Sequence, residues 1–166
     1  MKKFMLMFAL ATLFVINGNA QSAPWKIIDM EDVSRHGGNA AYDDETTTVT
    51  FKGEKDRWID LPGVSGDLTE HTKLNVTIKK STCMLRFAIR YKDADGKTQQ
   101  KICATCYKSM GKTIEKDTLL KIDLTDKGKI GEDVLKNVVS IRVAMAKAVD
   151  GNEAPWDVQF GEVVMP

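Results

Sequence analysis

The stretch CMLRFAIRYKDADGKTQQKICATCYK (residues 83–108) decides the fold, because apolar and polar side chains alternate along it. Successive side chains in a β-strand point to opposite faces of the sheet, so the alternation predicts a strand with one buried face and one polar face. The buried face is expected to carry Cys83, Leu85, Phe87 and Ile89. The opposite face is expected to carry Met84, Arg86, Ala88 and Arg90. This strand therefore presents two arginines on the side away from an apolar core.

The second half of the same stretch predicts the returning strand of a hairpin. Asp93-Ala94-Asp95-Gly96 has the residue types of a tight turn. The returning strand is expected to point Ile102, Ala104 and Cys106 inward. It is expected to point Lys101, Cys103, Thr105 and Tyr107 outward. Tyr107 then lies on the polar face.

The rest of the chain repeats this pattern of short strands separated by turn residues. Further strands are predicted at residues 25–30, 46–52, 57–61, 74–78, 120–124, 139–145 and 156–164, with a bulge expected at Gly161. Only residues 131–136 have a helical pattern. Short amphipathic strands at this spacing predict an all-β fold, a two-sheet antiparallel β-sandwich, because strands of a parallel α/β sheet are apolar on both faces.

The first 20 residues are interpreted as a secretory signal peptide. Lys2 and Lys3 precede an apolar run, Phe4 to Ile16, and small residues Gly18 and Ala20 precede the expected cleavage site. The run is shorter than the roughly 20 residues that a membrane-spanning helix needs, so we expect no membrane insertion after signal cleavage. The expected organisation is a signal peptide at 1–20 and one domain at 21–166, in a secreted or periplasmic protein.

The charge of the mature chain is nearly balanced. The whole chain has 24 basic and 23 acidic residues, and the signal peptide contains two of the lysines. A protein without a basic excess is not expected to bind nucleic acid or anionic membranes through its overall charge.

Three cysteines leave at least one thiol unpaired within an exported monomer. A four-residue hairpin loop places Cys83 opposite Cys106, a two-residue turn makes them diagonal neighbours, and both put Cys103 on the other face. A Cys83–Cys106 disulfide and two buried thiols are the two alternatives. We do not expect redox chemistry or a zinc site at Cys103-Ala-Thr-Cys106, because a strand separates the sulfurs and the chain has only His36 and His71 as further ligands.

The candidate binding residues lie at outward positions of the predicted strands. Four of them form a polar platform if their strands are neighbours: Arg86, Arg90, Arg142 and Tyr107. Guanidinium and phenol groups can bind hydroxyls, carboxylates or sulfates. The alternative is an ordinary solvated sheet face.

The three tryptophans are candidates for stacking on a sugar ring. Trp58 has the parity opposite Ile59 and Leu61, so we expect it to be the exposed one. Trp25 and Trp156 each begin an inward pattern near a proline and are expected to lie in the core.

A calcium site is considered at Asp29 and Asp157. Calcium prefers several oxygen ligands, and pairing of the first and last strands is expected to bring these two carboxylates together. The alternative is that they are charged residues at strand ends. The sequence contains no nucleophile elbow and no carboxylate pair in a recognisable glycosidase arrangement, so we do not expect an enzyme.

Three stretches resemble the galactose-binding-like jelly rolls, a β-sandwich family that includes many carbohydrate-binding modules. They are residues 38–40 with 48–51, residues 58–61 leading through 66–69 into 74–78, and residues 156–163. The signal peptide looks like those of Bacteroidetes. The resemblance implies non-catalytic glycan binding, and it implies a structural calcium between the N-terminal and final strands, with Asp157 at the family's acidic position.

The sequence therefore favours a secreted or periplasmic carbohydrate-binding protein whose partner is a polysaccharide or oligosaccharide. Trp58 or Tyr107 is expected to stack on the sugar, while Arg86 and Arg90 bind its polar groups. The alternative is a structural or protein-interaction domain of an exported assembly, which binds a protein partner through a sheet edge or face.

Overall fold

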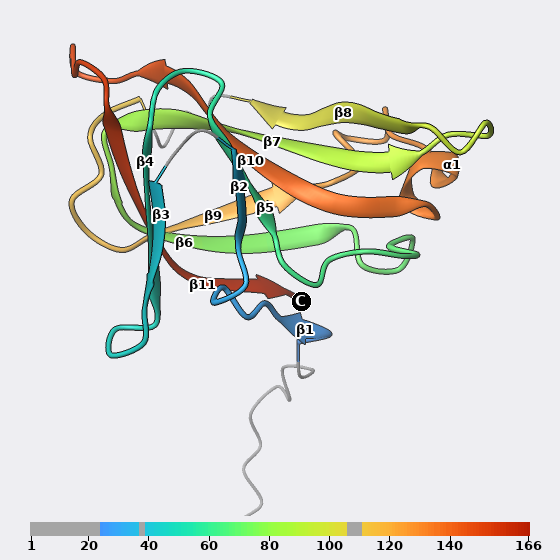
Figure 1. Cartoon of the computed structure of the whole chain (residues 1–166). Coiled ribbons are helices and arrows are strands. Elements are labelled where there is room, and N and C mark those ends of the chain that lie inside the picture. Colours follow the sequence, from blue (N-terminus) through green and yellow to red (C-terminus); the bar gives the residue numbers. More distant parts are fainter. Residues whose placement is uncertain (1–23, 37–38, 106–110) are drawn as a thin grey trace, which may run out of the picture.

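The strands form two antiparallel sheets that pack face to face (Figure 1). The computed structural model describes residues 24–36, 39–105 and 111–166. One sheet, here sheet A, runs in the order β3-β4-β11-β6-β9, with β1 also paired to β11. Its strands are β1 (Lys26–Ile27), β3 (Asn39–Asp43), β4 (Thr48–Gly53), β6 (Lys73–Ser81), β9 (Thr118–Asp123) and β11 (Trp156–Met165). The all-β two-sheet antiparallel sandwich is confirmed.

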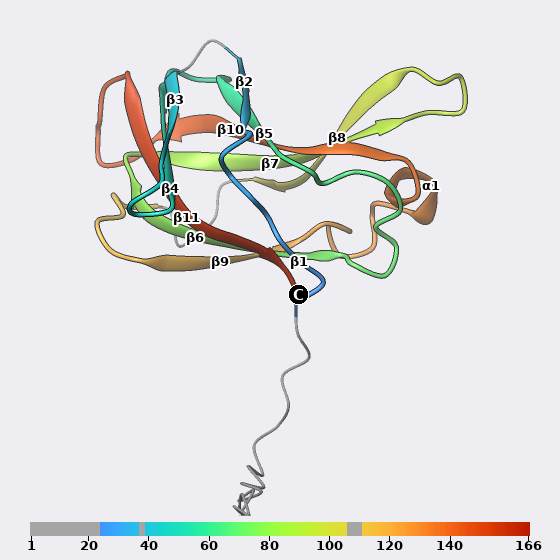
Figure 2. The ribbon, with the colours of Figure 1, turned by 60° about the horizontal axis from the view of Figure 1, so that its bottom comes forward.

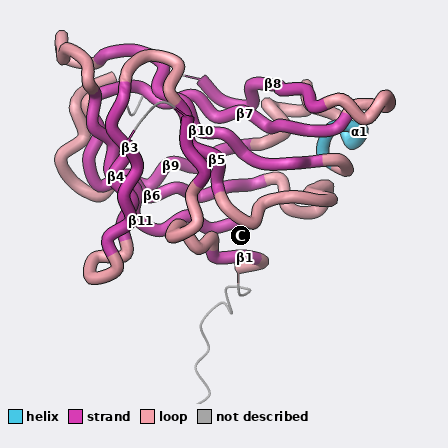
Figure 3. Tube along the Cα trace, viewed as in Figure 1, coloured by secondary structure: helices cyan, strands magenta, loops and turns pink. Residues whose placement is uncertain are grey.

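The second sheet, here sheet B, runs in the order β2-β5-β10-β7-β8. Its strands are β2 (Ser34–His36), β5 (Trp58–Leu61), β7 (Cys83–Lys92), β8 (Thr98–Thr105) and β10 (Val138–Ala148). In Figure 2, β7 and β10 of sheet B lie above β6 and β9 of sheet A, and the tip of the β7–β8 hairpin extends beyond the rest of its sheet. The short helix α1 (Glu132–Leu135) lies where the sequence predicts helix, and Figure 3 shows it beside an otherwise β-rich chain.

The core lies between the inner faces of the two sheets. Leu85, Phe87 and Ile89 of β7 are fully buried, as the alternation predicts. They face a cluster that includes Phe51 of β4 and Phe160 of β11, which are also fully buried. Each such side chain contributes about 1.5–3 kcal/mol by leaving water, so the facing strands hold the layers together.

Strands β2 and β3 were not predicted from the sequence, and β1 is shorter than the predicted strand at residues 25–30. β3 has the sequence NAAYD, which lacks the β-branched residues typical of strands, and it forms as an edge strand beside β4. The expected irregularity at Gly161 is present, because the β11–β6 register shifts between Phe160 and Val163. None of the helical segments in the described part of the chain has the length and hydropathy of a membrane span.

The returning strand has the opposite parity to the one predicted as far as Cys103. Beyond the register shift, Ala104 lies opposite the buried Phe87 and packs against the core, as predicted. Asp93 N–H donates to the Lys97 carbonyl at 2.9 Å, so the loop between them contains three residues, with Gly96 at φ +73°. Both predicted loops have an even number of residues. Since a one-residue change in register moves the side chains of this part of the strand to the other face, Ile102 points outward and is 47% exposed.

Cys103 consequently lies in the core rather than on the surface. It is 4% exposed, and its thiol donates to the Phe87 carbonyl at 3.3 Å. It is the extra residue where the β7–β8 register shifts, since Ala88 pairs with Ile102 and Phe87 with Ala104. Cys106 and Tyr107 lie outside the described residues.

A pair of adjacent substitutions tests this register. Ile102→Lys is expected to change the free energy of unfolding by less than about 0.5 kcal/mol, because the side chain already points into water. Cys103→Lys is expected to cost about 3 kcal/mol or more, because it buries an unpaired charge. Urea denaturation followed by circular dichroism measures both, and the opposite ranking contradicts the register.

Candidate functional site

Strand pairing gathers most of the predicted binding residues on the outer face of sheet B. β10 lies between β5 and β7, and its Ala144 is opposite both Trp58 and Arg86. One pair further along, Arg142 is opposite Asp60 on one side and Ala88 on the other. Directly opposed residues in antiparallel strands share a face. We call this surface the arginine face, defined by Trp58, Asp60, Arg86, Arg90, Ser140 and Arg142.

Asp60 is the centre of the polar contacts on the arginine face. Arg142 Nε donates to Asp60 Oδ1 at 2.9 Å and Arg142 Nη2 donates to Oδ2 at 3.1 Å, which is a bidentate ion pair. Arg90 Nη1 donates to the same Oδ2 at 3.1 Å. The Asp60 side chain is only 11% exposed. A paired charge with so little exposure to water is weakly screened, so Asp60 fixes both guanidinium groups.

Trp58 is half-buried rather than open to solvent on both sides of its ring. The Arg142 Cζ atom lies 3.3 Å from the centre of the Trp58 ring. This cation–π contact places a guanidinium group over one face of the indole. The ring therefore supports Arg142, and a ligand reaches at most its other face and its edges.

Arg86 is the least constrained guanidinium of the arginine face. Its Nη1 is 3.4 Å from Asp56 Oδ1, and the Asp56 side chain is 61% exposed. Its Nε–H is buried and has no hydrogen-bond partner in the protein, and the same holds for Ser140 Oγ. Leaving a buried polar group without a partner costs about 1–3 kcal/mol.

Four of the five predicted ligand-binding residues thus lie on one face: Trp58, Arg86, Arg90 and Arg142. The fifth, Tyr107, lies outside the described residues. Sequence reasoning missed Asp60 as a site residue. It shares the parity of Trp58 in the strand WIDL, but only the pairing of β5 with β10 shows that it meets Arg142.

The two carboxylates considered for calcium are not brought together. β1 pairs with β11 as expected, with Lys26 opposite Met165. This register places Asp29 beside Glu162, and both line a cavity of about 390 Å³. Asp157 is five residues from Glu162, which corresponds to roughly 16 Å along a strand. The described residues contain no group of three or more His, Cys, Asp or Glu side chains that could hold a metal ion.

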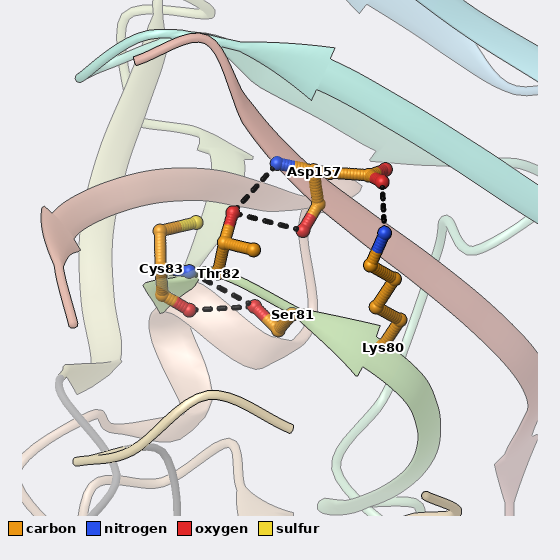
Figure 4. A network of polar contacts seen from close by, with 5 residues as sticks. All are labelled: Lys80, Ser81, Thr82, Cys83 and Asp157. Atoms are coloured by element: carbon orange, nitrogen blue, oxygen red, sulfur yellow. Dashed lines mark hydrogen bonds and ion pairs between the residues drawn. The ribbon is translucent and has the colours of Figure 1, made fainter. Parts of the chain in front are cut away.

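Asp157 instead belongs to a structural network where β6 meets β7 (Figure 4). Its Oδ2 accepts from Lys80 Nζ at 2.8 Å, and its backbone N–H donates to Thr82 Oγ1 at 2.8 Å. The Ser81 hydroxyl donates to the Cys83 carbonyl at 2.6 Å. These contacts attach the β6–β7 connection to the first residues of β11.

The described cysteines are buried free thiols, Cys83 and Cys103. Burial raises the pKa of each thiol to about 12. Because the thiolate is the reactive form, neither sulfur is suited to redox chemistry.

The other two tryptophans, Trp25 and Trp156, lie away from the arginine face. Trp156 is buried, as predicted, and its Nε1–H donates to the Asn152 carbonyl at 3.1 Å. Trp25 was expected in the core but is 43% exposed. It lies before the short β1 strand and stacks on His71, with ring centroids 4.1 Å apart. Trp25 is exposed despite the neighbouring proline and apolar residues, because it precedes the first residue of β1, Lys26.

Solved structures of carbohydrate-binding modules share this fold. The family 30 module of the cellulosomal cellulase Cel9D-Cel44B of Clostridium thermocellum has a TM-score of 0.51 and 17% identity, covering 83% of this chain and 92% of that one. A variant of CBM29-2 complexed with mannohexaose has a TM-score of 0.51 and 8% identity, covering 84% of this chain and 88% of that one. No protein-family model and no curated protein matches the chain. The chain therefore has a β-sandwich fold of the kind found in carbohydrate-binding modules.

The role of Asp60 can be tested against a matched surface carboxylate. Asp60→Asn is expected to lower the free energy of unfolding by about 3 kcal/mol, because it leaves the partly buried guanidinium groups of Arg90 and Arg142 without their charge partner. Asp56→Asn is expected to cost less than about 0.5 kcal/mol, because its ion pair with Arg86 is exposed and long. Urea denaturation measures both, and equal stability of the two variants contradicts the central position of Asp60.

Proposed function

We propose that this protein binds carbohydrate without catalysis, through the arginine face. The observation that carries the proposal is the gathering of Trp58, Arg86, Arg90 and Arg142 on one outer sheet face by strand register. The fold of carbohydrate-binding modules supports it. A β-sandwich exposes a broad sheet surface along which an extended sugar chain can lie.

The groups of the arginine face suit recognition rather than bond cleavage. Guanidinium groups donate several hydrogen bonds in a fixed planar arrangement. Asp60 accepts from two of these groups, so it orients donors for a ligand. Donors held in place before binding lose little side-chain freedom when a ligand arrives, which favours affinity.

Binding to a panel of soluble polysaccharides in affinity gel electrophoresis tests the proposal. Arg86→Ala and Arg90→Ala are each expected to weaken the binding of a retained polysaccharide at least about tenfold, as loss of a central contact does. Lys52→Ala is the matched control, since Lys52 is an exposed cation on β4 of the other sheet. Retention that is the same in all three variants contradicts the assignment of the arginine face.

We also propose that the chain is exported, on the basis of its first 20 residues. Their charged start, apolar run and small-residue ending support cleavage after Ala20. Intact-mass spectrometry of protein recovered from the periplasm or medium of a bacterial host is expected to show a chain that begins at Gln21. A full-length chain retained in the cytoplasm contradicts export.

A further inference from the structure

We infer that the carbohydrate bound by the arginine face is acidic, carrying carboxylate or sulfate groups, and that Arg86 is the principal contact for such a group. This inference rests on the proposed function and narrows it from carbohydrates in general to one chemical class. Carboxylates and sulfates share the oxyanion chemistry that a guanidinium group recognises.

The first step concerns the aromatic surface. Neutral sugars bind many proteins by placing their apolar ring face on an exposed aromatic ring. On the arginine face, Arg142 already lies over Trp58, with Cζ 3.3 Å from the ring centre. The surface next to the indole is therefore a guanidinium group, which offers hydrogen-bond donors and positive charge.

The second step concerns charge. Arg142 and Asp60 form a bidentate pair and largely satisfy each other. Arg86 and Arg90 add two further positive charges, and Lys147 adds another at the position opposite Met84. The negative charges near these groups are fewer: Arg90 shares the Asp60 carboxylate with Arg142, and Arg86 pairs with the exposed Asp56. The face therefore keeps an excess of positive charge, although the chain as a whole is nearly neutral.

The third step identifies Arg86. Its contact with Asp56 is 3.4 Å long and the Asp56 side chain is 61% exposed, so a ligand oxyanion can replace that carboxylate. Its Nε–H is buried, so a ligand meets the Nη end of the guanidinium group. An oxyanion in place of Asp56 can bind the terminal Nη groups of Arg86 in the bidentate geometry that guanidinium favours. Arg90 has its Nη1 engaged by Asp60 and is the secondary contact.

The spacing of the two arginines on β7 indicates how an acidic oligosaccharide would lie on the arginine face. Arg86 and Arg90 are four residues apart on the same side of one strand, with Ala88 between them. Four residues of strand span about 13 Å, so the two guanidinium groups can meet separate acidic groups of one oligosaccharide that lies along β7. Oligosaccharides with several acidic units are then expected to bind more tightly than a single acidic sugar.

The test uses two pairs of polymers that differ in charge. Polygalacturonate is compared with its methyl ester, and dextran sulfate with dextran, by affinity electrophoresis at one fixed ionic strength. The variants are Arg86→Gln and Arg86→Lys, with Lys52→Gln as the control on sheet A. Circular dichroism melting of each variant establishes that it is folded.

The expected result is retention by a charged polymer and at least tenfold weaker retention by its neutral counterpart. Binding of polygalacturonate identifies carboxylate as the recognised group, and binding of dextran sulfate alone identifies sulfate. Arg86→Gln is expected to weaken this binding at least tenfold, and Lys52→Gln less than twofold. Arg86→Lys keeps the charge but loses the bidentate geometry, so a loss of several-fold is expected, and this variant decides the matter if Arg86→Gln does not fold.

Two results overturn the inference while leaving the proposed function in place. One is equal binding of charged and neutral polymers. The other is specific binding of neutral polysaccharides that depends on Arg86 or Arg90. If Lys52→Gln weakens acidic binding as much as Arg86→Gln does, the attraction is diffuse and the inference is also wrong. Failure to bind any polysaccharide, charged or neutral, overturns the inference and the proposed function together.

Discussion

The two sheets hold together because apolar side chains alternate along the strands at the centre of each sheet. Phe87 on β7 and Phe160 on β11 are fully buried from opposite layers. The same alternation that sends Phe87 into the core sends Arg86 to the outer face, so core and candidate site are two consequences of one backbone geometry. A shift in the register of β7 or β10 would therefore disrupt both at once.

On the outer face, one carboxylate organises the charges. Asp60 lies on β5 and joins Arg142 of β10 to Arg90 of β7, so its contacts cross the three central strands of sheet B. Arg142 in turn packs on Trp58. The result is a guanidinium surface that is ordered by the protein itself, which leaves Arg86 as the group with most freedom to respond to a ligand.

The pattern of the sequence was sufficient for strand β7 and insufficient for strand β8. Within β7, alternation alone separates Phe87 from Arg86, because burial repeats every second residue. For β8 the parity depends on the number of residues in the hairpin loop and on a bulge at Cys103, and neither leaves a clear mark in the sequence. The same limitation hid the partnership of Asp60 with Arg142, since contacts between strands depend on register. It also led to the expectation that Asp29 lies near Asp157, because pairing of the right strands does not fix which of their residues meet.

The pairing of β1 with β11 has a consequence for how this domain can be joined to other polypeptides. Lys26 is opposite Met165, so both ends of the folded region lie side by side at one end of the β1–β11 pair of sheet A, as Figure 1 shows. The arginine face belongs to the other sheet. A tether or fusion partner attached at either end would therefore extend from the layer behind that face, and anchoring the domain to a support would leave its arginines directed toward the surroundings.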